Sequence, residues 1–155
     1  MSDMNVPLQT SPKSETSHLA QGLREDLLHH DPLLDCLVEL TRIHGRPSTR
    51  AALSAGLPLP KGGLPPSLFS RAAARAGLSC KILRRPLEKI DAALLPVVLL
   101  LEGDGACLLL GWDDRGEMAS LLFPEAGQGV VLLSREQLLG RYVGIAIFSR
   151  PNFRF

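Results

Sequence analysis

The sequence lacks several features that would assign the protein to a class at once. Its formal net charge is only +1, so it has no basic excess of the kind that binds nucleic acids. Its three cysteines, Cys36, Cys80 and Cys107, are an odd number at irregular spacing. Such a set argues against a disulfide framework and fits a reducing compartment.

Long hydrophobic runs are also missing. The longest, from Leu94 to Leu101, is interrupted by Pro96, whereas a membrane-spanning helix needs about 20 apolar residues. The first residues, Met1 to Pro7, contain neither the basic nor the apolar part of a secretory signal. We therefore expect a soluble, cytoplasmic chain or a segment of a larger one.

The 155 residues suit one globular domain preceded by a tail. Residues 1–25 are rich in Ser, Thr, Pro and Gln and predict a flexible N-terminal tail. The pair His29-His30 has no cysteine or carboxylate after it at ligand spacing, so a solvated linker is preferred to a metal site. No metal, nucleotide or other cofactor is expected.

Three helices are predicted in the first half of the domain. Asp31 and Pro32 form a typical helix start, and Leu33, Leu37 and Leu40 lie on one helical face up to the stop at Gly45. Cys36 is expected to pack on this helix as a small apolar side chain. The other two helices are expected at 48–56, capped by Ser48 or Thr49, and at 67–76.

The second half predicts an antiparallel sheet. Turn sequences at 102–105 and 113–116 separate short apolar runs, as in β-hairpins. Helices followed by such strands indicate an α+β fold. The expected strands are 78–83, 97–101, 106–112, 117–123, 129–133 and 142–148, with short helical turns at 86–92 and 134–137.

Three stretches together resemble a known family, the double-glycine-leader cysteine-peptidase domains of type I secretion ABC transporters. They are Asp31–Leu40 with His44-Gly45, then Gly103–Leu110, and finally Arg150–Phe155. The similarity runs from about His30 to the end. It implies a papain-like cysteine-peptidase fold with N-terminal helices packed on an antiparallel sheet, a domain at 26–150, and at 151–155 the start of a linker to a membrane domain.

The resemblance also implies that all four catalytic positions are altered. Pro32 stands for the nucleophilic cysteine, Cys107 for the histidine, Phe123 for the orienting aspartate and Asp26 for the oxyanion-hole glutamine. Pro32 offers neither a nucleophile nor a backbone N–H, and Phe123 cannot orient an imidazole. The expected domain is therefore a catalytically inactive relative.

Inactive domains of this family belong to exporters of haemolysins and large RTX adhesins. The resemblance implies recruitment of an unfolded RTX adhesin on the cytoplasmic side of the bacterial inner membrane, next to the transporter's membrane and nucleotide-binding domains. Three alternatives stay open. They are an active peptidase that cleaves a Gly-Gly leader with Cys36 or Cys107, a docking domain for a cytosolic regulatory protein, and a structural brace for the transporter dimer.

Two surfaces are candidates for substrate binding. The first is the vacated cleft, with the expected lining Pro32, Leu33, Cys107, Leu108, Phe123 and Pro124. Leu108 and Phe123, on adjacent strands, are more often core residues than part of a binding surface, and Cys107 also fits a purely space-filling role. The second-choice surface is Ile43 with Leu101. Trp112 fits either an anchor for a partner or packing on the sheet, and Arg84-Arg85 either a solvated strand end or a contact to acidic substrate segments.

Overall fold

The computed structural model describes residues 31–60, 63–124 and 129–152, and the described part begins with three helices. Asp31 caps the first helix by accepting a hydrogen bond from the Leu34 N–H, and Thr49 caps the second through the Ala52 N–H. Pro32 and Pro66 each open a helix, where their missing N–H costs nothing. The three helices are α2 (Pro32–Ile43), α3 (Arg50–Ser54) and α4 (Pro66–Ala74).

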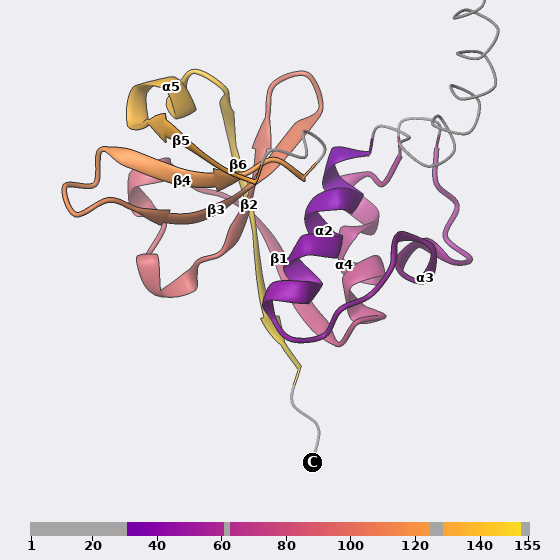
Figure 1. Ribbon diagram of the computed structural model, residues 1–155. Helices are drawn as coiled ribbons and strands as arrows, with labels where there is room; N and C mark the ends of the chain where they lie inside the picture. The colour runs from indigo at the N-terminus through magenta and orange to yellow at the C-terminus, as the bar shows by residue number, and fades with distance from the viewer. Residues whose placement is uncertain (1–30, 61–62, 125–128, 153–155) are drawn as a thin grey trace, which may run out of the picture. The chain divides into compact units, whose positions relative to one another are not determined.

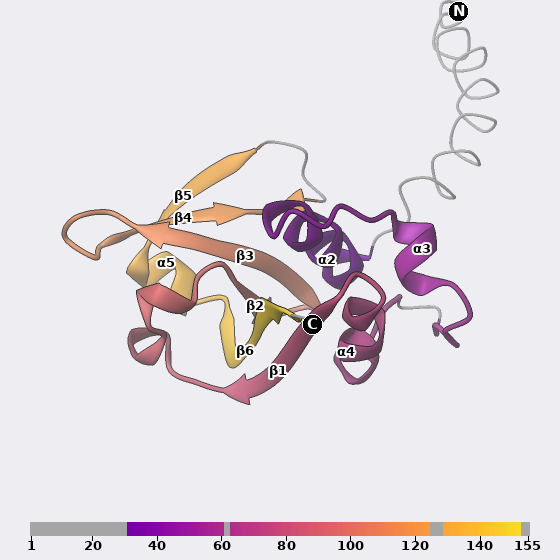
Figure 2. The ribbon, with the colours of Figure 1, turned by 90° about the horizontal axis from the view of Figure 1, so that it is seen from below.

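Six antiparallel strands form one sheet, in the order β1-β6-β2-β3-β4-β5. Figure 2 shows the strands in this order, with β1 and β5 at the two edges. The strands are β1 (Leu78–Arg84), β2 (Val97–Leu101), β3 (Gly105–Trp112), β4 (Met118–Leu122), β5 (Val130–Ser134) and β6 (Tyr142–Pro151). Two 3-10 turns, Leu87–Lys89 and Ala92–Leu94, and helix α5 (Arg135–Leu139) connect them.

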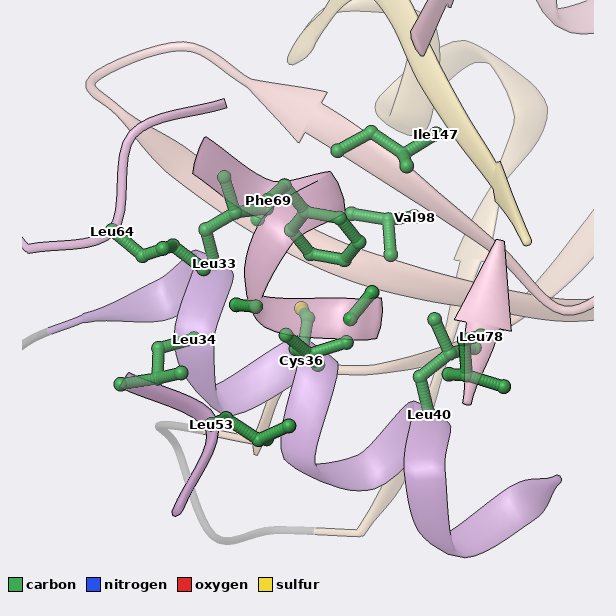
Figure 3. Packing of buried hydrophobic residues seen from close by; sticks show 14 of the residues in the cluster. Leu33, Leu34, Cys36, Leu40, Leu53, Leu64, Phe69, Leu78, Val98 and Ile147 are labelled. Atoms are coloured by element: carbon green, nitrogen blue, oxygen red, sulfur yellow. The ribbon is translucent and has the colours of Figure 1, made fainter. Parts of the chain in front are cut away.

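Helices α2 and α4 pack on one face of the sheet, and α3 packs against these two helices, as Figures 1 and 2 show. We call the buried cluster between them the helix-side core (Figure 3). Burying its leucines and Phe69 is the main source of stability here, at about 25 cal/mol per Å² of apolar surface. Its labelled members in Figure 3 are Leu33, Leu34, Cys36, Leu40, Leu53, Leu64, Phe69, Leu78, Val98 and Ile147.

A second cluster, the far-side core, lies on the opposite face of the same sheet. It forms because successive side chains of a strand point to opposite faces, so Val98 belongs to the helix-side core while Val97 and Leu99 belong to the far-side core. Leu138 of α5 and Leu87 of the first 3-10 turn cover this face. The central strands β2 and β3 are thus apolar on both faces.

The predicted α+β arrangement of helices on an antiparallel sheet is confirmed. Every predicted helix and strand is present, with ends shifted by a few residues; α4, for example, begins at Pro66 rather than Ser67. Residues 151 and 152, predicted to begin a linker, lie against β1 and the turn before it. Pro151 pairs with Leu78 inside β6, and the Asn152 N–H donates to the Gly77 carbonyl at 2.7 Å.

Several predictions concern residues outside the described part of the chain. They include the tail at 1–25, the domain start at 26 with Asp26, the pair His29-His30, and the end of the expected linker at 153–155. Within the described ranges, no helix has both the length and the hydropathy that a bilayer crossing requires.

Candidate functional site

A cavity of about 410 Å³ opens at the start of α2, and we call it the helix-start cavity. Four segments far apart in the sequence meet there: the first turn of α2, the loop before α4, the β2–β3 hairpin and β6. Their lining residues are Asp31, Pro32, Leu33, Pro60, Gly63–Pro66, Leu100–Ala106 and Val143.

Asp31 holds two of these segments together. Asp31 as a whole is only 3% exposed, and its carboxylate accepts hydrogen bonds from the Leu34 N–H at 3.3 Å and from the Leu64 N–H at 3.0 and 3.1 Å. Gly63 lies directly against it with φ +94°, and a Cβ added there would come within 2.7 Å of three Asp31 carboxyl atoms. The cap of α2 therefore also fixes one wall of the cavity.

The chemical groups in this lining are few. Among its described residues there is no thiol, hydroxyl or imidazole, so the lining lacks the thiol and imidazole that a cysteine peptidase uses. The charged residues are the three acids Asp31, Glu102 and Asp104, and the rest are apolar side chains and glycines. Pro32, at the first position of α2, has no N–H to offer an oxyanion.

The expectation that Cys107 and Leu108 line this cleft is wrong. Both side chains are fully buried, and strand alternation sends them to opposite faces, Cys107 into the far-side core and Leu108 into the helix-side core. Ala106 is the β3 residue that shares the cavity with Pro32. A β3 side chain can reach the start of α2 only from the face of Ala106 and Leu108.

Phe123 and Pro124 are likewise not part of the cavity lining. Phe123 packs against the far-side core, with the Arg141 guanidinium 5.2 Å from the centre of its ring. Pro124 is half-buried. Of the six residues expected to line one cleft, the structure brings together only Pro32 and Leu33.

The second-choice surface is also divided. Ile43 is 46% exposed at the end of α2, whereas Leu101 is 3% exposed and lines the cavity at the start of that helix. At 1.5 Å per residue, the length of α2 separates the two by roughly 16 Å. Leu101 therefore belongs to the helix-start cavity and Ile43 does not.

The three cysteines are buried or half-buried. Cys36 and Cys107 are 0% exposed, and burial raises the pKa of Cys107 and of Cys80 to about 12. His44 lies at the far end of α2, with its Nε2 3.4 Å from the Ser149 hydroxyl. Burial, and then Arg46, lower the pKa of His44. The described residues contain no cluster of three side chains able to hold a metal.

Sequence reasoning missed several residues of the cavity, above all Leu64, Val143 and the hairpin residues Glu102 and Asp104. One signal was available for Ala106. Once Leu108 is placed under α2, alternation along β3 puts Ala106 on the same face. Val143 and the loop at 63–66 come from segments whose position depends on the tertiary fold, so no local pattern could have placed them.

No family model matches the sequence, and no curated protein matches it. Among solved structures, the N-terminal peptidase C39-like domain of the toxin secretion ATP-binding protein from Vibrio parahaemolyticus is 36% identical, with a TM-score of 0.75. The match covers 79% of this chain and 98% of that domain.

Two more distant structures share the fold. The peptidase domain of Streptococcus ComA, a bi-functional ABC transporter involved in quorum sensing, is 19% identical with a TM-score of 0.68, and the match covers 79% of this chain and 92% of that one. The double-glycine-motif protease of an AMS/PCAT transporter, solved with its leader peptide, is 18% identical with a TM-score of 0.65, covering 79% and 85%. The predicted papain-like fold is thereby confirmed.

Proposed function

The chain belongs to the peptidase C39-like domains of ABC transporters, and we propose that it is a non-catalytic member that binds the polypeptide to be exported. The sequence resemblance to RTX exporters suggests the substrate, an unfolded adhesin of that type. It also suggests the location, the cytoplasmic side of the bacterial inner membrane, next to the transporter's membrane and nucleotide-binding domains.

The observation that carries the proposal is the composition of the helix-start cavity. A cysteine peptidase of this kind needs a thiol at a helix start with a histidine beside it, because an isolated thiol is mostly protonated at neutral pH. Here the described lining has Pro32 at the helix start and Ala106 on β3, with no sulfur or imidazole. This lining supports a cavity that keeps its place at the helix start and has apolar residues at these two positions.

The remaining surface suits weak capture of extended chain. Leu64, Leu100 and Val143 supply apolar contact, and the exposed hairpin residues Glu102 and Asp104 form an acidic rim. An unfolded ligand loses conformational entropy when it is held, so the expected affinity is modest. Modest affinity agrees with export, which requires release.

The main alternative is peptide cleavage with Cys36 or Cys107. Both sulfurs are fully buried, and with a pKa of about 12 Cys107 has almost no thiolate at neutral pH. Moreover, neither lies in the helix-start cavity. We expect both thiols of the native protein to react with a thiol reagent only when the domain unfolds.

Binding can be tested by an NMR titration of the chain with unfolded, calcium-free segments of the adhesin that the transporter exports. Shifts are expected at Leu64, Ala106 and Val143. Val143→Asp should weaken binding because it puts a charge on an apolar wall that is 43% exposed. Val130→Asp on β5, at a site 58% exposed and outside the cavity, is the matched control and should bind as the native chain does.

Two results would overturn the proposal. One is a titration in which no segment of the adhesin shifts any cavity residue. The other is cleavage of a Gly-Gly leader peptide that disappears in Cys107→Ala or Cys36→Ala, which would establish a peptidase instead.

A further inference from the structure

A second cavity, of about 470 Å³, lies over β1 and β6. Leu78 and Cys80 of β1 belong to the helix-side core, so Lys81 and Leu83 point to the other face of the sheet. We call this site the basic groove. The residues that define it here are Lys81, Leu83, Arg85, Leu94, Phe148 and Arg150.

The charge of this groove is all of one sign. Its described lining contains Lys81, Arg85 and Arg150 and no acidic residue. Across the described ranges, the ion pairs are Arg42–Glu39 and Arg50–Asp35, and neither involves the groove. Its three cations are therefore not neutralised by a carboxylate of the described chain, and they attract an anionic ligand.

The cations follow the strands in a line and do not converge on a point. In the register of β1 and β6, Arg150 lies opposite Ser79. Lys81 comes two residues after Ser79 on β1, and Arg85 follows four residues after Lys81. At about 3.3 Å per residue, the three charges cover roughly 20 Å of strand. That spacing suits several negative charges on an extended chain better than one small anion.

The floor between the cations is apolar. Phe148 lies in the middle, with the Arg85 guanidinium 5.4 Å from its ring centre, and Leu94 is 47% exposed beside it. A cation stacked on an aromatic ring is held in place while its outer N–H groups stay available. The groove therefore presents apolar side chains between spaced cations. A peptide in which acidic and apolar residues alternate would match this pattern.

We propose that the basic groove binds an extended acidic peptide segment, with carboxylates on Lys81, Arg85 and Arg150 and apolar side chains on Phe148 and Leu94. This site is separate from the helix-start cavity, since the two share no lining residue. β1 is the last strand of the sheet, so no further strand closes the groove on that side (Figure 2). A segment within a long chain can enter it without threading an end.

The test uses the full chain and a synthetic peptide of about ten residues in which Asp alternates with Val and Leu. Its affinity is measured by calorimetry beside the same peptide with every Asp replaced by Asn. The double variant Lys81→Glu, Arg150→Glu should weaken the acidic peptide about tenfold or more. The matched control is Arg71→Glu, Arg84→Glu, an equal charge change at exposed sites outside the groove, which should stay within about twofold.

Distinct outcomes would overturn the inference. Equal weakening by both double variants would show attraction to net charge alone, and equal binding of the Asn peptide would remove the role of charge. Tighter binding of a single-stranded thymidine oligonucleotide of equal charge would assign the groove to nucleic acid. Val143→Asp should leave the acidic peptide unaffected, so failure at the helix-start cavity and failure at this groove are told apart.

Discussion

The helix-start cavity and the basic groove are similar in volume, about 410 and 470 Å³, but their charges have opposite sign and opposite roles. In the cavity the buried carboxylate of Asp31 accepts hydrogen bonds from the Leu34 and Leu64 N–H groups, so it holds the cavity wall in place. In the groove Lys81 and Arg150 are exposed on strands whose pairing does not depend on them. The charge in the helix-start cavity therefore stabilises the fold, whereas the charges of the basic groove remain available to a ligand.

The difference has a physical lesson. A buried charge is tolerated only where hydrogen bonds replace its hydration, so it becomes part of the fold and ceases to be available to ligands. An exposed charge contributes little to stability and stays available for recognition. Substitution of the buried Asp31 should therefore destabilise the protein, whereas substitution of the exposed groove cations should change ligand choice.

The largest expected effect is at Asp31. Asp31→Ala removes a helix cap and leaves the buried Leu64 N–H without its acceptor, which should lower the free energy of unfolding by about 3 kcal/mol. Asp91→Ala is the control, since Asp91 caps an exposed 3-10 turn through the Ala93 N–H alone and should cost about 0.5 kcal/mol. Urea unfolding followed by circular dichroism measures both. Equal losses would contradict a framing role for Asp31.

The second effect concerns Gly63, the neighbour of that carboxylate. Gly63→Ala should cost roughly 2–3 kcal/mol, because alanine is strained at φ +94° and its Cβ would displace the Asp31 carboxyl group. Gly103→Ala, at φ +70° with no atom within 4 Å of the added Cβ, should cost only the backbone strain, about 1–2 kcal/mol. The same urea experiment compares the two variants. A smaller loss of unfolding free energy for Gly63→Ala than for Gly103→Ala would show that the loop around Gly63 rearranges to accept the added Cβ.

The third effect is a difference between the two sites in how strongly salt weakens ligand binding. Raising NaCl from about 50 to about 300 mM should weaken the acidic peptide about tenfold, since its partners are exposed cations. Binding of an uncharged unfolded segment at the helix-start cavity should change little, because apolar contact dominates there. Calorimetric titrations at the two salt concentrations test this, and equal weakening of both ligands would erase the distinction.

The smallest effect involves His44, which joins the end of α2 to Ser149 beside the basic groove. Burial, with a further contribution from Arg46, lowers the pKa of His44, so the unfolded chain takes up a proton first as the pH falls through about 6.5. The free energy of unfolding should then fall slightly between about pH 7.5 and 5.5. In His44→Gln the decrease in the free energy of unfolding between these pH values should be smaller, and urea unfolding midpoints at both pH values measure it. An equal decrease in the variant and the native protein would exclude His44 as the source of the pH dependence.

The sequence allowed most of the fold to be predicted, because local chemistry determines it. Asp31-Pro32 and Gly45 bracket α2, and apolar runs between turn residues locate the strands. Ser134 with Gln137 forms the capping box of α5 that the sequence suggests. Trp112 packs on the sheet with the Arg135 guanidinium 4.3 Å from its ring centre, the simpler of its two interpretations.

The site could be predicted only in part. Pro32 and Leu33 are in the cavity because they begin α2, a local property. Cys107 differs from its prediction because the resemblance gives a position along the chain, whereas strand alternation in β3 turns this side chain to the far-side core. Val143 and Leu64 required knowledge of long-range packing, and the basic groove exists only because β6 returns between β1 and β2.

The position of Trp112, the only tryptophan, has a practical consequence for spectroscopy. Its indole packs against the far-side core and lines neither described cavity, so its emission should report loss of the sheet while staying almost silent when a ligand binds at either site. Tyr142, the only tyrosine, donates its hydroxyl to the Arg85 carbonyl next to the groove. Trp112 is thus a native probe of unfolding, whereas Tyr142 is a native probe next to the proposed peptide-binding groove.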